Sequence, residues 1–198
     1  MGVPWKKEKK TVKKVNIFYT LNINARLQSF DRADIYADRI DDEIISAGIG
    51  EIDGGGSLLN TNGEIVSCDV DIVLNNEDSG TFNQLIEILN KFEFPKGSRL
   101  SNDDGDNIVQ LGNLEGMAVY LNGTDLPENV YKDCDVNYVI EKMNKKMNGL
   151  GSMYSYFEGN KETALYFYGK SFEQMKQAIE TFTAKYPLCE KCRIEKIA

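Results

Sequence analysis

Apolar and polar positions follow one another along the chain with two different periods, and together they predict strands interleaved with helices. Residues 19–24 and 119–123 have the pattern of strands, and their Leu-Asn steps lie 100 residues apart. Each strand precedes a segment, residues 30–47 or 135–148, whose apolar side chains recur every three or four positions. That spacing gathers the apolar side chains on one side, so each segment is predicted to be an amphipathic helix.

The same order of signals continues after these helices in both halves of the chain. A glycine step, beginning at Gly48 or at Gly149, suits the left-handed residue that closes many helices. A predicted hairpin follows each step, and Thr81 and Ser171 then open a second pair of helices as capping boxes. The spacing between matching signals falls from 101 to 90 residues, which places an eleven-residue insertion, the glycine-rich stretch 53–63, in the first hairpin.

This repeated order predicts an internal duplication. A βαββαβ unit forms a four-stranded antiparallel sheet with two helices on one face, the ferredoxin-like arrangement. We therefore predict the α+β class and a tandem duplication of ferredoxin-like halves. The predicted divisions are a basic N-terminal tail at 1–14, a first half at 15–101, a linker at 102–107 and a second half at 108–198.

The second half resembles a short and largely uncharacterised bacterial domain. The resemblance rests on the glycine step at 149–151, the Leu-Tyr-Phe-Tyr-Gly strand at 165–169 and the helix at 172–182. The first half keeps the glycine step but has Ile-Val-Leu-Asn at 72–75 in place of the aromatic strand. Such domains are similar to some bacterial toxin-immunity proteins. The resemblance therefore implies a ferredoxin-like fold and a binding role, with no assigned catalytic residue.

Charge is distributed unevenly along the chain. The net charge is −8, but residues 1–14 carry +5, residues 15–98 carry −10 and the remainder carries −3. An acidic body repels nucleic acid, because binding there needs Lys and Arg to displace counterions, so no nucleic-acid partner is predicted. The chain has neither an apolar run long enough to span a bilayer nor a secretory apolar segment. We therefore expect a cytoplasmic protein without a membrane partner.

The residues that carry chemistry do not predict an enzyme. The chain has no histidine, which removes the commonest general base. Cys189 and Cys192 have CxxC spacing, but they follow a helix instead of opening one, which does not favour redox chemistry. The segment 169–171 ends like a phosphate loop but lacks the first glycine of that motif. We predict no cofactor and no metal.

Acidic residues recur at three- and four-residue spacing along the first predicted helix and continue just beyond it, which suggests a docking face. The candidate partner-binding residues are Asp31, Asp34, Asp38, Asp41, Asp42, Glu51 and Asp53. An ordinary solvated face is the other interpretation. The predicted function is non-catalytic binding of a basic protein, as an immunity protein would bind a nuclease-type toxin. The alternative is a regulatory module that holds a small molecule between the two halves, near the glycine steps.

Overall fold

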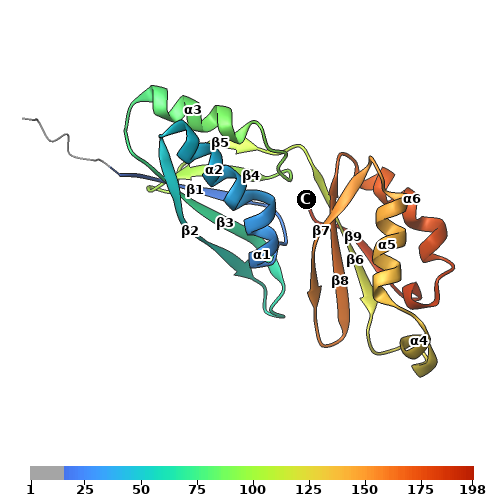
Figure 1. Ribbon diagram of the computed structural model, residues 1–198. Helices are drawn as coiled ribbons and strands as arrows, with labels where there is room; N and C mark the ends of the chain where they lie inside the picture. Colours follow the sequence, from blue (N-terminus) through green and yellow to red (C-terminus); the bar gives the residue numbers. More distant parts are fainter. Residues whose placement is uncertain (1–15) are drawn as a thin grey trace, which may run out of the picture.

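The computed structural model describes residues 16–198 and contains two antiparallel sheets (Figure 1). The first sheet has the strand order β2-β3-β1-β4-β5 and the second has the order β7-β8-β6-β9. The first is built from β1 (Ile17–Ile23), β2 (Gly50–Leu59), β3 (Ile65–Leu74), β4 (Ser98–Asn102) and β5 (Asn107–Leu111). The second is built from β6 (Glu115–Asn122), β7 (Gly151–Glu158), β8 (Glu162–Gly169) and β9 (Arg193–Lys196). Four strands of each half thus share one order, which confirms the predicted α+β duplication of ferredoxin-like units.

The helices of each half pack on one face of its sheet. The first half has a continuous helix composed of α1 (Ser29–Arg32), the π-helical segment η1 (Ala33–Ala37) and α2 (Asp38–Ala47), followed by α3 (Ser79–Leu89). The second half has α4 (Glu128–Asp133), α5 (Val136–Lys146), α6 (Phe172–Thr183) and the 3-10 turn η2 (Pro187–Cys189). Gly48 and Gly149 have φ of 68° and 80°, the left-handed conformation that the glycine steps predict. No helix within residues 16–198 has the length and apolar character needed to cross a membrane.

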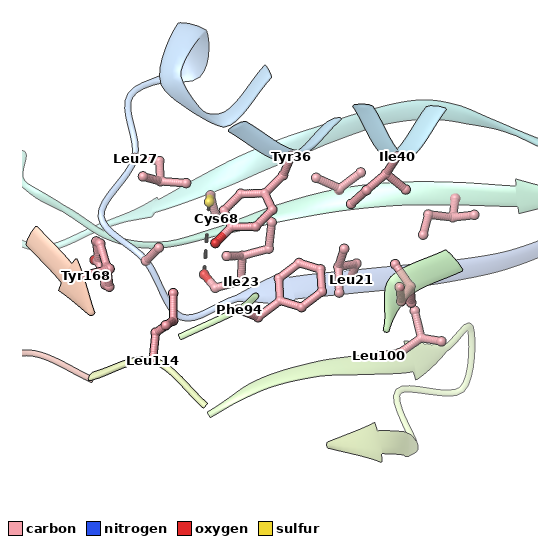
Figure 2. Close-up of a cluster of buried hydrophobic side chains, with 14 of the residues drawn as sticks. Leu21, Ile23, Leu27, Tyr36, Ile40, Cys68, Phe94, Leu100, Leu114 and Tyr168 are labelled. Carbon is pink, nitrogen blue, oxygen red and sulfur yellow. Dashed lines mark hydrogen bonds between the residues drawn. The ribbon is translucent and has the colours of Figure 1, made fainter. Parts of the chain in front are cut away.

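Strand alternation builds the core of the first half. Leu21 and Ile23 point from β1 toward the helices, where they are fully buried against Tyr36 and Ile40 (Figure 2). The second half has its own helix-facing core, in which Val119 and Phe167 lie among the buried residues of α5 and α6.

The opposite face of the second sheet is buried as well. Tyr120, Tyr166 and Tyr168 belong to the same buried cluster as the core of the first half. Figure 2 shows Tyr168 reaching the first half beside Leu27 and Cys68. The two halves therefore share one continuous apolar interior across their interface, so the first half acts as the cover for this sheet.

Residues 102–107 do not form the predicted linker. Asn102 ends β4 and Asn107 begins β5, and the residues between them turn a hairpin that adds a fifth strand to the first sheet. The polar cluster resembled a linker because tight turns and linkers use the same residue types. The chain instead crosses to the second sheet through Gly112, whose φ is 96° and where a Cβ atom would lie 2.0 Å from the Pro95 carbonyl oxygen. The predicted tail at 1–14 lies outside the described residues.

The glycine-rich stretch is mostly strand instead of an insertion at the hairpin tip. Gly54, Gly55 and Gly56 lie inside β2 and pair with β3. The segment from Gly50 to Leu74 has 25 residues and its counterpart from Gly151 to Gly169 has 19, so the first hairpin is six residues longer, not eleven.

Part of that error comes from the helix caps. Asp78, and not Thr81, caps α3, because its carboxylate accepts a hydrogen bond of 2.8 Å from the Thr81 amide. Ser171 caps α6 as predicted. Asp and Thr are both favoured at N-caps, and with Asp78 as the cap α3 begins three residues earlier than a cap at Thr81 would allow.

Candidate functional site: an acidic helix face and the cleft between the halves

The structure divides the seven predicted acidic residues into three groups. Asp31 and Asp41 have structural partners. Asp31 accepts a hydrogen bond from the Ser155 hydroxyl of the second half. Asp41 accepts one of 2.8 Å from the amide of Ile52, on the outer strand β2. Both carboxylates therefore fasten the helix to its neighbours, which an analysis of helical spacing cannot reveal.

Glu51 and Asp53 lie on strand β2 and not on the acidic helix. Both are exposed residues of β2 that flank Ile52, whose side chain packs against the core beneath the helices. Since side chains alternate along a strand, Glu51 points to the other face of the sheet. Asp53 lies at an irregularity between Ile52 and Gly54, where the pairing with β3 shifts register.

The remaining three residues, Asp34, Asp38 and Asp42, are all exposed and follow one another at four-residue spacing along η1 and α2. We refer to them as the acidic surface. None of them forms an ion pair with any residue of the described chain, 16–198.

The two arginines of the same helix do not neutralise this surface. The Arg32 guanidinium donates to the carbonyl of Gly56 on β2. The Arg39 guanidinium lies 5.4 Å from the centre of the Phe92 ring and donates to the Ile35 carbonyl. Their positive charges are thus directed to the strand and to an aromatic ring, which leaves the three carboxylates facing solvent.

A second polar cluster joins the two halves beside the hairpin tips. Glu64, which is 8% exposed, comes from the first half and receives hydrogen bonds from the hydroxyls of Tyr120 (2.8 Å) and Tyr166 (2.7 Å) of the second half. The Arg26 guanidinium pairs with the same carboxylate, and the Asn60 amide donates to its other oxygen at 3.0 Å. The cluster is fully satisfied, as a buried charge must be.

The surroundings shift the pKa values of Glu64, Tyr120 and Tyr166 further from neutral pH. Burial raises the pKa of Glu64, but the hydrogen bonds from Tyr166 and Tyr120 and the charge of Arg26 outweigh it, so the pKa lies below its ordinary value. Burial, followed by the hydrogen bond to Glu64, raises the pKa of Tyr120 to about 12, and the same two causes raise the pKa of Tyr166. Glu64 is therefore a carboxylate and both tyrosines are neutral donors at physiological pH.

Two cavities flank the cluster, and the Phe157 side chain lines both. The larger, of about 570 Å³, is lined by Glu64 and Tyr120 and by the tips of both hairpins, including Asn62 and Lys161. The smaller, of about 350 Å³, is lined by residues of both halves: Arg26, Gln28, Leu59, Gly63, Ile65, Tyr156, Phe157, Glu158 and Tyr166. A space between the halves was expected near the glycine steps, whereas both cavities lie at the opposite ends of the strands that follow those steps.

The sequence patterns did not single out Arg26, Glu64, Tyr120 or Tyr166. One signal was available: Ala164–Tyr168 is apolar at every position, which is typical of a strand buried on both faces. Nothing local marks Glu64, because its partners are up to 102 residues away in the chain. Among residues 16–198, no group of three or more Cys, Asp or Glu side chains is arranged to hold a metal ion.

Comparisons with known proteins give no family for the chain. No family model matches it, and no curated protein sequence matches it significantly. An unknown protein from Galdieria sulphuraria is 8% identical, with 92% of this chain and 98% of that one covered and a TM-score of 0.29. A putative monooxygenase from Lactobacillus acidophilus is 14% identical, with 93% of each chain covered and a TM-score of 0.27. The first two RRM domains of yeast poly(U)-binding protein are 10% identical, covering 92% and 99%, with a TM-score of 0.24. Likenesses this distant carry no argument about activity.

Proposed function

We propose that this is a non-catalytic binding protein that recognises a basic protein partner through the acidic surface. The observation that carries the proposal is the arrangement around Asp34, Asp38 and Asp42. Three exposed carboxylates share a helix with two arginines, and both arginines are bonded elsewhere. An unneutralised surface of one sign attracts a partner of the other sign and speeds its association.

A toxin-immunity role is the specific form of this function that we favour. Nuclease toxins bind phosphate with positively charged surfaces, so an acidic immunity protein would complement their active-site clefts. The charge of −10 on residues 15–98 fits this role, because the attraction acts over about a Debye length and not only at contact.

The cleft chemistry supports a role without catalysis. A general acid or base works best when its pKa lies near the working pH. The hydrogen bonds around Glu64 lower the pKa of that carboxylate, and burial together with the hydrogen bond to Glu64 raises the pKa of Tyr120, so both pKa values lie outside that range. Arg26 and the two hydroxyls are already bonded to Glu64 or to each other. The cluster thus has the properties of a structural joint between the halves.

One observation favours the second candidate, a small-molecule-binding module. The cavity of about 570 Å³ between the hairpin tips has the size of many ligand sites and mixes aromatic with polar walls. A ligand there would raise the unfolding temperature in a saturable manner, which a thermal-shift screen of metabolites would detect.

The test uses the protein encoded by the neighbouring gene, purified in a form with its active site inactivated. We expect that protein to be basic and to form a one-to-one complex in size-exclusion chromatography. We also expect the active form to be inhibited when the two are mixed. A neighbouring product that is acidic, or a basic one that forms no complex at low ionic strength, would contradict the proposal.

A further inference from the structure

The rim of the smaller cavity exposes large apolar side chains that a folded surface ordinarily avoids. Of the seven exposed large hydrophobic residues among those described, Leu59 (55% exposed) and Tyr156 (46%) line this cavity. Phe30, which is 89% exposed, does not line it but stands on the first turn of α1, two residues beyond the lining residue Gln28. We call these three residues the rim patch.

The first turn of α1 lies on the side of the first half that faces the second half (Figure 1). The Gln28 amide donates to the Ser155 hydroxyl at 3.1 Å, and the Gln28 side chain donates to the Tyr156 carbonyl at 2.9 Å. On the other side, Arg32 bonds the Gly56 carbonyl of β2. Hydrogen bonds on both sides therefore hold the turn that carries Phe30, so little backbone ordering is needed when a partner covers this side chain.

The floor of the cavity is not suited to a charged ligand. Arg26 and Tyr166 line it, but the Arg26 charge is paired with Glu64 and the Tyr166 hydroxyl is bonded to the same carboxylate. The remaining walls include Leu59, Ile65 and Phe157, which offer apolar contact. A volume of about 350 Å³ accepts one large side chain more readily than a peptide segment. The cavity thus has the character of an anchor pocket for a single aromatic or aliphatic residue.

The charge near this pocket favours particular residues beside the partner side chain that would enter it. Glu158 is exposed and lines the cavity, and Asp34 follows Phe30 by four residues on the same helix. Neither carboxylate forms an ion pair with a residue of the described chain. A side chain that enters the cavity beside Glu158 is best flanked by Lys or Arg.

We infer that the rim patch and its cavity form the anchor site for the basic partner, receiving an aromatic side chain flanked by Lys or Arg. This inference rests on the proposed function and deepens it, because the acidic surface then acts at long range while the rim patch acts at contact. Charged residues at a rim mainly change association, whereas buried apolar anchors mainly change dissociation.

The first experiment tests the chemistry of the site without the partner. The tripeptides Arg-Trp-Arg, Arg-Ala-Arg and Glu-Trp-Glu are titrated into the isotope-labelled protein, and amide shifts are followed by NMR. We expect saturable shifts at Phe30, Leu59 and Tyr156 with Arg-Trp-Arg only, with a Kd on the order of 1 mM. The double variant Phe30→Ser, Leu59→Ser should weaken that binding at least tenfold. Both side chains are exposed, so the variant should keep the wild-type spectrum elsewhere.

Other outcomes would overturn the inference. Shifts that map away from the rim patch, or no saturable shifts, would exclude an anchor site there. Equal shifts with Glu-Trp-Glu would show that the site has no preference for basic residues, which would exclude a basic partner. Shifts that change with protein concentration in the absence of peptide would assign the patch to a second copy of the chain.

A kinetic experiment with the neighbouring gene's product separates this inference from the proposed function. We expect the Phe30→Ser, Leu59→Ser variant to dissociate at least tenfold faster with an unchanged association rate. If it behaves as wild type while neutralising the acidic surface slows association, only the anchor site is wrong. If neither variant changes the kinetics, the proposed function is wrong as well.

Discussion

The two sheets share a strand order but differ in the face that their own helices leave open. Aligned through Gly50 and Gly151, the first sheet places the pairs Thr20–Asp71 and Asn22–Asp69 where the second sheet has Ala118–Tyr166 and Tyr120–Ala164. In the first sheet these pairs are hydrogen-bonded polar side chains, at 3.1 and 2.7 Å. In the second sheet they are apolar or aromatic and buried.

The difference shows how a duplicated fold can divide its surfaces. The face of the second sheet that its own helices leave open forms the interface with the first half, so the tyrosines on that face lie inside the molecule. The first half keeps a polar open face and carries most of the net negative charge, with −10 in residues 15–98. The first half is therefore the one that can present charge to a partner, and the second half supports it.

Exchanging the two faces should give the largest effect. Tyr166→Asp would bury a carboxylate beside Glu64, and we expect a loss of about 4 kcal/mol in the free energy of unfolding. The matched change in the first sheet, Asp71→Tyr, should cost less than about 1 kcal/mol, because that residue is only partly buried. Urea unfolding of both variants measures this. Equal losses would mean that the two faces do not differ in environment.

Replacing Glu64 should cause the next largest loss in the free energy of unfolding, because this residue joins the two halves. Glu64→Gln should cost about 2 kcal/mol near neutral pH, through weaker hydrogen bonds from Tyr120 and Tyr166 and an unpaired Arg26. The folded-state pKa of Glu64 lies below its ordinary value of 4.5, so the stabilisation is present above that value and is lost as pH falls through the folded-state pKa.

The measurement is the free energy of unfolding of wild type and Glu64→Gln from neutral pH into acid. The difference should shrink on acidification, whereas the exposed control Glu158→Gln should show little difference at any pH. A difference that grows as pH falls would contradict the arrangement around Glu64.

Both halves end a helix with a left-handed glycine, and replacing either glycine should cause an equal and smaller loss of stability. Gly48→Ala and Gly149→Ala should each cost about 1 kcal/mol, because both glycines have positive φ and no neighbour within 4 Å of an added Cβ. Gly54→Ala is the control, since Gly54 lies in β2 without a positive φ. Thermal unfolding of the three variants decides the matter, and unequal losses at the two helix ends would show that they are not equivalent.

The fold was predictable from the sequence because its signals are local. The glycine steps, the helical stripes and the cap at Ser171 each depend on a few adjacent residues, and their repetition revealed the duplication. The alignment of the first strands was two residues out of register, because Asn22 is equivalent to Tyr120 and not to Asn122. A Leu-Asn step is too short to fix a register that long-range strand pairing sets.

The candidate site was less predictable because tertiary contacts decide it. Helical spacing placed five aspartates on one face. Asp31 and Asp41 instead bond to Ser155 and Ile52, and the helix changes pitch within η1. The cluster around Glu64 joins residues from both halves, so no local pattern contains it. Only the unbroken apolar run at 164–168 hinted that the second sheet is covered on both faces.

The central claim is that the acidic surface guides a basic partner, and association kinetics test it most directly. The variant Asp34→Asn, Asp38→Asn, Asp42→Asn is compared with wild type by stopped-flow mixing with the neighbouring gene's product. A second-half control, Glu173→Gln, Glu180→Gln, Glu190→Gln, removes the same charge from exposed positions. We expect the first variant to associate about tenfold more slowly at low ionic strength, with the gap closing at high salt, and the control to change far less. Equal association rates for wild type and the acidic-surface variant at low ionic strength would contradict the claim.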